Sequence, residues 1–507
     1  MTETIWDGSA STDWGTAANW SNGIGNDYHC ILPDMSSISN KPTLTGDISV
    51  GSIRAVTNSE IVGGGYQITC SLEGTTSEGF EGYAASFDGT ITGILSLKIT
   101  TAGFTYLDLV APSGNIHDLE INHSGGDYKA LVGNTTLTGT LWIKDGNLKM
   151  NGDSDTLSVT EDIKLGNGSD TGFFGHDDHD GAMDARSLDI VTAGSTFIST
   201  EGVLTLDGKN GSNFSFDNQG TFTNNSGTLK LTGDGGQIRE QGTGNIHHLI
   251  VDLGGASETH RLSDSTTVEG NLTITEGDFQ PNGRNLTVAG TTQITGTLTC
   301  SSGNMSFGTG LTSGWGLDIQ SGGTFTGGSG IHTIGSIFAA GGGTRTITLS
   351  SGATTIDSKN TGNGFTINLA SGATFNHGGG TVTMTYAGNT LIQLSGGTLA
   401  FNTFTYNASG RTLELRSPMS CAGNLTLTAG TLDTKSGTNH ALTVNGELSN
   451  AGTFTGNSSA VIARNLLVTA GTFTAPDGSG SLTLTGEGGS GSGDGYVFRR
   501  TGGSFTH

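Results

Sequence analysis

The stretch 271–299 is NLTITEGDFQPNGRNLTVAGTTQITGTLT, and its pattern returns over 424–455 as NLTLTAGTLDTKSGTNHALTVNGELSNAGTFT. One constant offset relates the two copies, so that Leu272 corresponds to Leu425 and Gly277 to Gly430. Apolar residues alternate with threonine in both copies, and glycine follows each alternating run. Agreement over so many positions exceeds what a shared composition would produce.

Further repeats surround this stretch. The same offset relates Phe222 to Phe375, and a weaker copy begins near Leu141. A short echo relates Asn424 to Asn465. Internal repetition of this kind is the signature of a repeat architecture.

Short runs of alternating apolar and polar residues fill the chain from about residue 46, separated by Gly, Asn, Asp and Ser. This period of two predicts strands with one buried face. Examples are ILSLKI (94–99), LKLTG (229–233), TRTITLS (344–350), FTINLA (365–370), TVTMT (381–385) and SLTLTG (481–486).

Two architectures fit many short strands. Tandem antiparallel sandwiches would need linkers between domains of about 100 residues, and the sequence contains no linker. A parallel β-helix stacks each strand on the strand one coil away and tolerates loops of variable length. The sequence therefore predicts an all-β, elongated parallel β-helix (β-solenoid), with ~22 residues per coil.

The alternation also predicts which side chains form the core. Leu272 and Ile274 should point inward, whereas Thr273 and Thr275 should point outward, where β-branched residues suit a pleated surface. Gly and Asn are expected at the corners, because both tolerate the positive φ that a tight coil needs.

Residues 1–45 differ from the rest because they contain Trp6, Trp14 and Trp20. We interpret this segment as a Trp-rich N-terminal cap or attachment segment, because an uncovered solenoid end presents unpaired strand edges. The alternative is that the three indoles form a ligand-binding platform for carbohydrate.

Residues 46–486 form the predicted solenoid repeat body, and residues 487–507 a C-terminal cap or tail. The four cysteines are widely spaced, and no CxxC pair suggests zinc or redox chemistry. They are expected to be small buried side chains.

The chain is acidic, with 21 Lys and Arg against 45 Asp and Glu and a formal net charge of −24. Such a charge argues against a nucleic-acid partner, because binding to phosphates requires basic side chains. No apolar run approaches the roughly 18 residues of a membrane helix, so no membrane insertion is expected. The first residues show no export signal.

One cluster of ionisable residues resembles a metal site. His176, Asp178, His179 and Asp180 lie within one loop, and Asp184 is close by. Imidazole and carboxylate groups are competent ligands, and Ca²⁺ would be the cofactor of such a loop. The alternative is a solvated acidic insertion on one coil. No other cofactor is indicated.

The succession NLTIT, NLTV and GTLT, together with GTFT and GTLKLTG, resembles the β-helical repeat proteins of phage tail fibres and spikes and of bacterial adhesins of the autotransporter passenger type. The resemblance covers roughly residues 90–490. It implies the fold and a role in attachment, and it carries over no catalytic residue.

Three functions follow from this resemblance. The first is a structural virion protein, namely a phage tail fibre, spike or capsid decoration protein, on the virion surface. Its partners would be other virion proteins and a host-surface glycan, and the resemblance also implies a homotrimer. The alternatives are a secreted β-helical adhesin, extracellular or on the bacterial cell surface, and a polysaccharide-degrading enzyme. The first function involves no catalysis.

Overall fold

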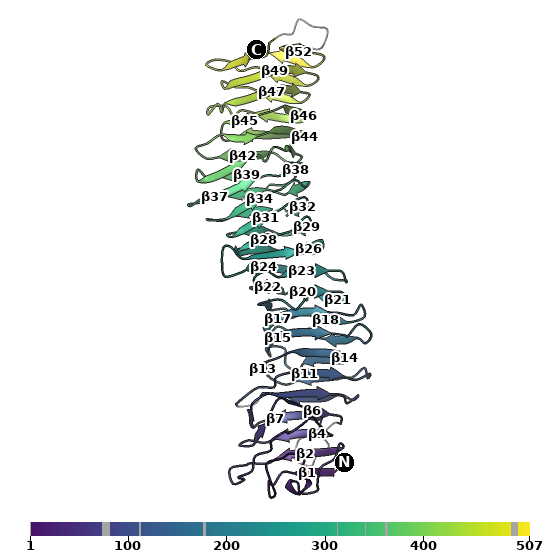
Figure 1. Ribbon diagram of the computed structural model, residues 1–507. Coiled ribbons are helices and arrows are strands. Elements are labelled where there is room, and N and C mark those ends of the chain that lie inside the picture. Colours follow the sequence, from purple (N-terminus) through teal and green to yellow (C-terminus); the bar gives the residue numbers. More distant parts are fainter. Residues whose placement is uncertain are drawn as a thin grey trace. The chain divides into compact units, whose positions relative to one another are not determined.

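The computed structural model describes residues 2–72, 82–110, 113–175, 179–311, 313–339, 341–359, 364–487 and 495–507. Within these ranges the regular elements are β-strands and one short 3₁₀ helix, η1 (Ala17–Asn19), joined by turns and loops. It forms two compact units, Met1–His248 and Leu249–His507. In each unit short strands stack above one another in successive layers (Figure 1). No helix in the described ranges is long and apolar enough to cross a bilayer.

The strands of the first unit form three columns, in which each strand pairs in parallel with its counterpart one coil away. Long strands bend at a corner, so that their two halves belong to different columns. Column 1 comprises β1 (Thr2–Ile5), β2 (Tyr28–Leu32), β4 (Ser52–Ala55), β7 (Tyr83–Phe87), β10 (Thr105–Asp108), β12 (Tyr128–Leu131), the second half of β14 (Leu141–Met150), β16 (Gly172–Phe174), β18 (Thr196–Ile198) and β21 (Thr221–Thr223).

Column 2 carries the candidate site described below. It comprises β3 (Ile48–Val50), β6 (Tyr66–Cys70), β9 (Leu95–Ile99), β11 (Leu119–Asn122), the first half of β14, the second halves of β15 (Leu157–Leu165) and β17 (Met183–Ile190), β20 (Phe214–Asn218) and β23 (Gln237–Glu240). Column 3 comprises β5 (Glu60–Val62), β8 (Thr90–Thr92), β13 (Thr135–Leu137), the first halves of β15 and β17, β19 (Val203–Leu206) and β22 (Thr228–Leu231).

The second unit repeats this plan. Column 4 comprises β24 (His248–Asp252) from Leu249 on, β27 (Leu272–Glu276), β30 (Thr292–Ile294), β33 (Leu317–Ile319), β36 (Ile337–Ala339), β39 (Phe365–Leu369), β42 (Thr390–Leu394), the second halves of β44 (Thr403–Leu415) and β46 (Leu425–Asp433), β48 (Thr453–Thr455), β50 (Thr472–Thr474) and β53 (Ser504–Thr506).

Column 5 comprises β25 (Thr259–Leu262), β28 (Asp278–Gln280), β31 (Thr297–Thr299), β34 (Thr324–Thr326), β37 (Arg345–Thr348), β40 (Ala373–Asn376), β43 (Leu399–Phe401), β45 (Met419–Cys421), the first halves of β47 (Leu442–Asn450) and β49 (Ala460–Val468), and β51 (Ser481–Leu484). Column 6 comprises β26 (Thr266–Val268), β29 (Leu286–Val288), β32 (Met305–Phe307), β35 (His332–Ile334), β38 (Ala353–Ile356), β41 (Thr381–Met384), the remaining halves of β44, β46, β47 and β49, and β52 (Phe498–Arg500).

The predicted all-β parallel solenoid is therefore confirmed within each unit. Leu97, Leu119 and Leu141 are successive register partners, and their even spacing agrees with the coil length of ~22 residues expected from the sequence. Coil length varies more in the second unit. There the coil from Leu286 to Met305 is shorter, and the coil from Ile337 to Ile367 is longer. Loops at the corners absorb the difference.

In each unit the core consists of the inward side chains of its three columns. Leu272 and Ile274 are fully buried, whereas Thr273 is partly exposed and Thr275 exposed, as the alternation predicts. Inward aromatic residues continue from coil to coil. Phe473 stacks on the rings of Phe454 and Phe505, with centroid distances of 4.5 and 5.6 Å. The predicted burial of the cysteines is also confirmed, and all four are free thiols: Cys30, Cys70, Cys300 and Cys421.

The corners explain why Asn and Gly recur together in the repeated stretch. The side-chain Oδ1 of Asn271 accepts a hydrogen bond from the backbone N–H of Thr291 on the next coil, at 2.9 Å. A Cβ atom on Gly290, the neighbouring residue of that coil, would lie only 2.3 Å from this Oδ1. Asn424 makes the same bond to the N–H of Glu447, again at 2.9 Å. The asparagine therefore links two coils, and the glycine leaves room for it.

The sequence repeat and the coil register are not the same thing. Following register partners from Leu286 through column 6 leads to Leu425. Leu272, which matches Leu425 in the sequence, lies in column 4. The offset between the two sequence copies is therefore not a whole number of coils. The echo from Asn424 to Asn465, by contrast, spans two coils, because Leu425, Leu448 and Leu466 are successive partners.

Both terminal segments contribute strands. Residues 1–45 include β1 and β2, which pair with each other and then with β4. The tail 487–507 contains β52 and β53, which pair with β49 and β50. The expected cap and tail thus contain coil strands themselves.

Candidate functional site

An outward row of polar side chains runs along column 2 of the first unit. Lys98, Glu120, Trp142 and Lys164 are register partners on four successive coils. Each follows an inward Leu or Ile, so the strand alternation turns these four side chains to the solvent side. The row therefore places an aromatic ring between charged groups on an open sheet surface.

The row continues on the next coils with Asp189, Asp217 and Arg239. The Arg239 guanidinium donates to both carboxylate oxygens of Asp217, one bond measuring 2.6 Å. Such a bidentate ion pair is a strong, directional contact. This ion pair lies at the Arg239 end of the row.

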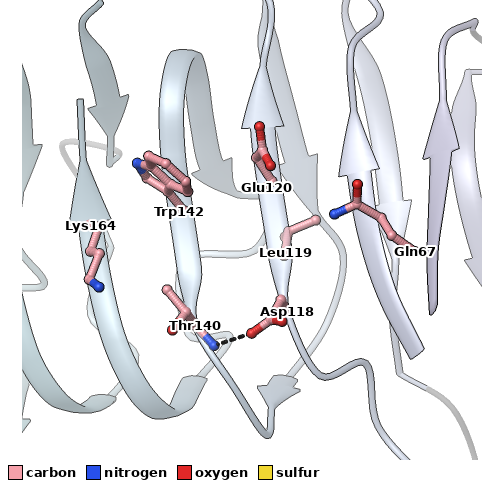
Figure 2. A pocket seen from close by; sticks show the side chains of 7 residues that line it. All are labelled: Gln67, Asp118, Leu119, Glu120, Thr140, Trp142 and Lys164. Atoms are coloured by element: carbon pink, nitrogen blue, oxygen red, sulfur yellow. Dashed lines mark hydrogen bonds between the residues drawn. The ribbon is translucent and has the colours of Figure 1, made fainter. Parts of the chain in front are cut away.

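A hollow of about 400 Å³ lies on this surface beside Trp142, which we call the first hollow. Figure 2 shows its side chains on neighbouring strands, with Lys164 at one end, Gln67 at the other, and Trp142 and Glu120 between them. The described residues that line it are Gln67, Asp118, Leu119, Glu120, Thr140, Trp142 and Lys164.

Trp142 is held in a fixed orientation. Its indole Nε1–H donates to the carbonyl oxygen of Gly166 at 2.9 Å. The ammonium of Lys144, two positions along the same strand, lies 5.4 Å from the centroid of the indole. A cation at this distance is attracted to the ring face. The ring is therefore positioned before any ligand arrives.

The two carboxylates of the first hollow are engaged in contacts with the protein. Asp118 accepts from the backbone N–H of Thr140 at 2.8 Å, drawn as a dashed line in Figure 2, and from the hydroxyl of Ser96 at 3.1 Å. Glu120 forms an ion pair of 3.0 Å with Lys98. These bonds fix the carboxylates as hydrogen-bond acceptors along the hollow.

A second hollow, of about 420 Å³, lies beyond Trp142 and shares Trp142 and Lys164 with the first. Two lysines and an exposed valine, Val191, contribute to its wall. Within the described part of the chain, its lining is Trp142, Lys144, Lys164, Gly166, Asn167, Ser169 and Val191. Asp118 and Glu120 thus line only the first hollow, Lys144 only the second, and Lys164 both.

Farther along the row, Asp189 is almost completely buried, with 5% of its surface exposed. Burial raises the pKa of its carboxyl group to about 7. The hydrogen bond that Asn210 donates lowers this pKa, whereas the nearby carboxylates of Asp162 and Asp217 raise it further. Burial acts in the same direction on Asp162, but hydrogen bonds from Arg186 and Ser187 outweigh it and lower the pKa. Asp189 therefore carries a proton for part of the time near neutral pH.

The three tryptophans of the N-terminal segment lie inside the protein. Trp6 and Trp14 are fully buried and Trp20 is 4% exposed. Their rings pack against one another with centroid distances of 4.7 to 6.4 Å. The cap interpretation predicts this arrangement. It leaves no ring face for a sugar, so these side chains are not brought to a site.

The His and Asp loop is only partly described. His176 and Asp178 lie outside the described residues. His179 is 3% exposed, whereas Asp180 and Asp184 are exposed. Across the ranges that the structure describes, no three His, Cys, Asp or Glu side chains are grouped as a metal would need. The calcium site stays a prediction.

Sequence reasoning did not single out Trp142 or its lysines. The segment LWIK, residues 141–144, indicated only an alternating strand. The available signal was a tryptophan at an outward position of that alternation, where polar residues are expected.

Comparison with protein-family models, with curated proteins and with solved structures found no match to this chain.

Proposed function

We propose that this protein is a structural, surface-displayed component of a virus particle, such as a tail fibre, spike or capsid decoration, and that it binds a host-surface glycan. The observation that carries the binding role is Trp142, a pre-oriented, partly exposed indole between two polar hollows on an open sheet. The virion placement rests on the sequence resemblance and on the acidic, repetitive body.

The first and second hollows together, which we call the groove, have a chemistry that suits a sugar chain. An indole face packs against the C–H groups of a pyranose, while amide and carboxylate groups accept or donate bonds to its hydroxyls. Gln67 and Glu120 supply such groups on one side of Trp142 and Asn167 on the other. The two hollows lie side by side along the sheet, which favours an extended oligosaccharide over a compact ligand.

Binding is favoured over hydrolysis by the state of the carboxylates. Both oxygens of Asp118 accept hydrogen bonds, and Glu120 is paired with Lys98. Glycoside cleavage needs one carboxyl group that donates a proton and a second that acts as base or nucleophile. If the protein were instead a polysaccharide-degrading enzyme, it would release oligosaccharides and Glu120→Gln would stop the release.

The glycan-binding role is tested on a glycan array with the wild type, Trp142→Ala and a control, Trp315→Ala. Trp315 is a partly exposed tryptophan of the second unit that stacks on Phe338 at 4.7 Å. We expect Trp142→Ala to lose about tenfold in affinity, because the lost stacking contact contributes roughly 1.4 kcal/mol. The control should bind like the wild type. Equal binding by all three proteins would mean that the glycan does not bind at Trp142, which would contradict the proposed binding site.

The location is tested by immunogold electron microscopy of the source material with an antibody against this chain. Gold on virus particles supports the virion role, and its position on tail or capsid distinguishes a fibre from a decoration protein. Gold confined to the bacterial envelope or the medium would instead favour the secreted adhesin.

A further inference from the structure

The two hollows beside Trp142 differ in charge. The first is lined by Asp118, Glu120 and Lys164, whereas the second is lined by Lys144 and Lys164 and, among the described residues, by no carboxylate. A neutral sugar chain of identical units would gain no affinity from this difference in charge. A chain that carries an acidic group on one of its rings would be bound in one direction.

Lys144 is the cation best placed to meet such a group. Its ammonium lies near the ring of Trp142, and no carboxylate among the described residues lines the second hollow. Lys164 is committed more strongly, because its ammonium lies 3.3 Å from the buried carboxylate of Asp162. The cation–π contact holds Lys144 in the second hollow, beside Trp142, which lines both hollows.

The remaining groups of the second hollow leave room for an anion. Two acidic residues are adjacent in sequence to the lining, Asp145 next to Lys144 and Asp170 next to Ser169, and neither lines the hollow. Asp170 accepts a hydrogen bond of 2.6 Å from Asn167. Ser169 and Asn167 add polar atoms, and Val191 adds an apolar wall. The formal net charge of −24 would repel an acidic ligand elsewhere, so local lysines are required to accept one.

We propose that the groove binds an anionic oligosaccharide, with a neutral ring in the first hollow beside Glu120 and an acidic ring in the second hollow beside Lys144. This inference rests on the proposed glycan-binding function and adds the ligand class and its direction. The acidic group is a carboxylate of a uronic or sialic acid, or a sulfate on a hexose, because both present an anion to one ammonium.

The test measures affinities by titration calorimetry for three glycans with the same backbone: oligogalacturonate, its carboxyl-reduced form and a sulfated form of the latter. The proteins are the wild type, Lys144→Gln, Lys144→Arg and Lys209→Gln. Lys209 is an exposed lysine of the same unit outside both hollows. Lys209→Gln therefore removes the same charge as Lys144→Gln without altering either hollow. Circular dichroism establishes that each variant is folded.

We expect the wild type to prefer the anionic glycans over the reduced form by roughly five- to tenfold, with an advantage that shrinks as salt increases. Lys144→Gln should abolish the preference, so that this variant binds the anionic and reduced glycans with equal affinity. Lys144→Arg and Lys209→Gln should preserve it. The relative affinities of the carboxylated and sulfated forms identify the acid.

Two results would overturn the inference while the proposed function stands. They are equal binding of anionic and reduced glycans, and an anion preference that Lys144→Gln leaves intact, in each case with binding that Trp142→Ala abolishes. Binding that is insensitive to Trp142→Ala, or no binding of any glycan, would contradict the proposed function itself.

Discussion

Leu272 illustrates what an inward position requires. Its side chain is fully buried, with Leu249 and Thr292 as register partners on the coils before and after. A carboxylate at this position would lose its hydration without gaining a partner. We expect Leu272→Asp to lower the free energy of unfolding by about 3 to 5 kcal/mol, measured by urea denaturation.

The control for this change is the adjacent residue. Thr273 is partly exposed on the outward face, so Thr273→Asp introduces the same charge one position away. It should change stability by less than about 1 kcal/mol. If both variants unfolded at the same urea concentration, the in–out alternation of this strand would be wrong.

Asp189 gives a pH-dependent prediction. Its pKa is about 7 in the folded protein, against 3.8 as the ordinary value. The folded state therefore holds this proton more tightly than the unfolded state, and the associated stabilisation is complete below pH 4 and lost as pH rises through 7. Asp189→Asn, which imitates the protonated group, should stabilise the protein at pH 8 by about 4 kcal/mol.

This advantage should shrink as the pH falls from 7 towards 4. Thermal unfolding of wild type and variant at several pH values measures the difference. A constant difference across this window would mean that Asp189 does not hold a proton in the folded protein.

At the scale of elements, two variants test the hydrogen bond that Asn271 accepts from the next coil. One removes the acceptor oxygen, and the other retains it. Asn271→Ala leaves the N–H of Thr291 without its side-chain acceptor, and we expect a loss of about 1 kcal/mol. Asn271→Asp retains an oxygen at that position and should cost less. Urea midpoints that place the aspartate variant below the alanine variant would contradict the role of the side chain as acceptor.

Strands could be predicted from the sequence because alternation is a local property. LSLKI at 95–99 and TVTM at 381–384 both form strands where the pattern places them. Column membership could not be predicted, since all columns require the same inward apolar and outward polar residues. The match between Leu272 and Leu425 therefore identified similar strands in different columns.

The candidate site was not predictable for a related reason. Glu120, Trp142 and Lys164 come together only because successive coils of equal length bring them into register. Their spacing corresponds to no motif, and a site of this kind requires the register to be known. The N-terminal tryptophans were conspicuous in the sequence, but their concentration serves the packing of the cap.

At the scale of the whole molecule, the resemblance to phage appendages predicts a homotrimer. The chain has a mass of 51.6 kDa, so light scattering coupled to size exclusion should give a value about three times larger. The mass should not change with dilution through the micromolar range. A single species of one chain mass would contradict the trimer and leave the glycan-binding test unaffected.

The reuse of one strand sequence in two columns has a genetic consequence. An unequal crossover between the copies that begin at Asn271 and Asn424 would remove or add the segment between them, which is not a whole number of coils. Each downstream strand would then stack in a different column, yet it would still meet apolar neighbours inside and polar neighbours outside. We therefore expect genes of this kind to tolerate changes in length that are not a whole number of coils, so that recombination between repeats produces folded proteins of different lengths.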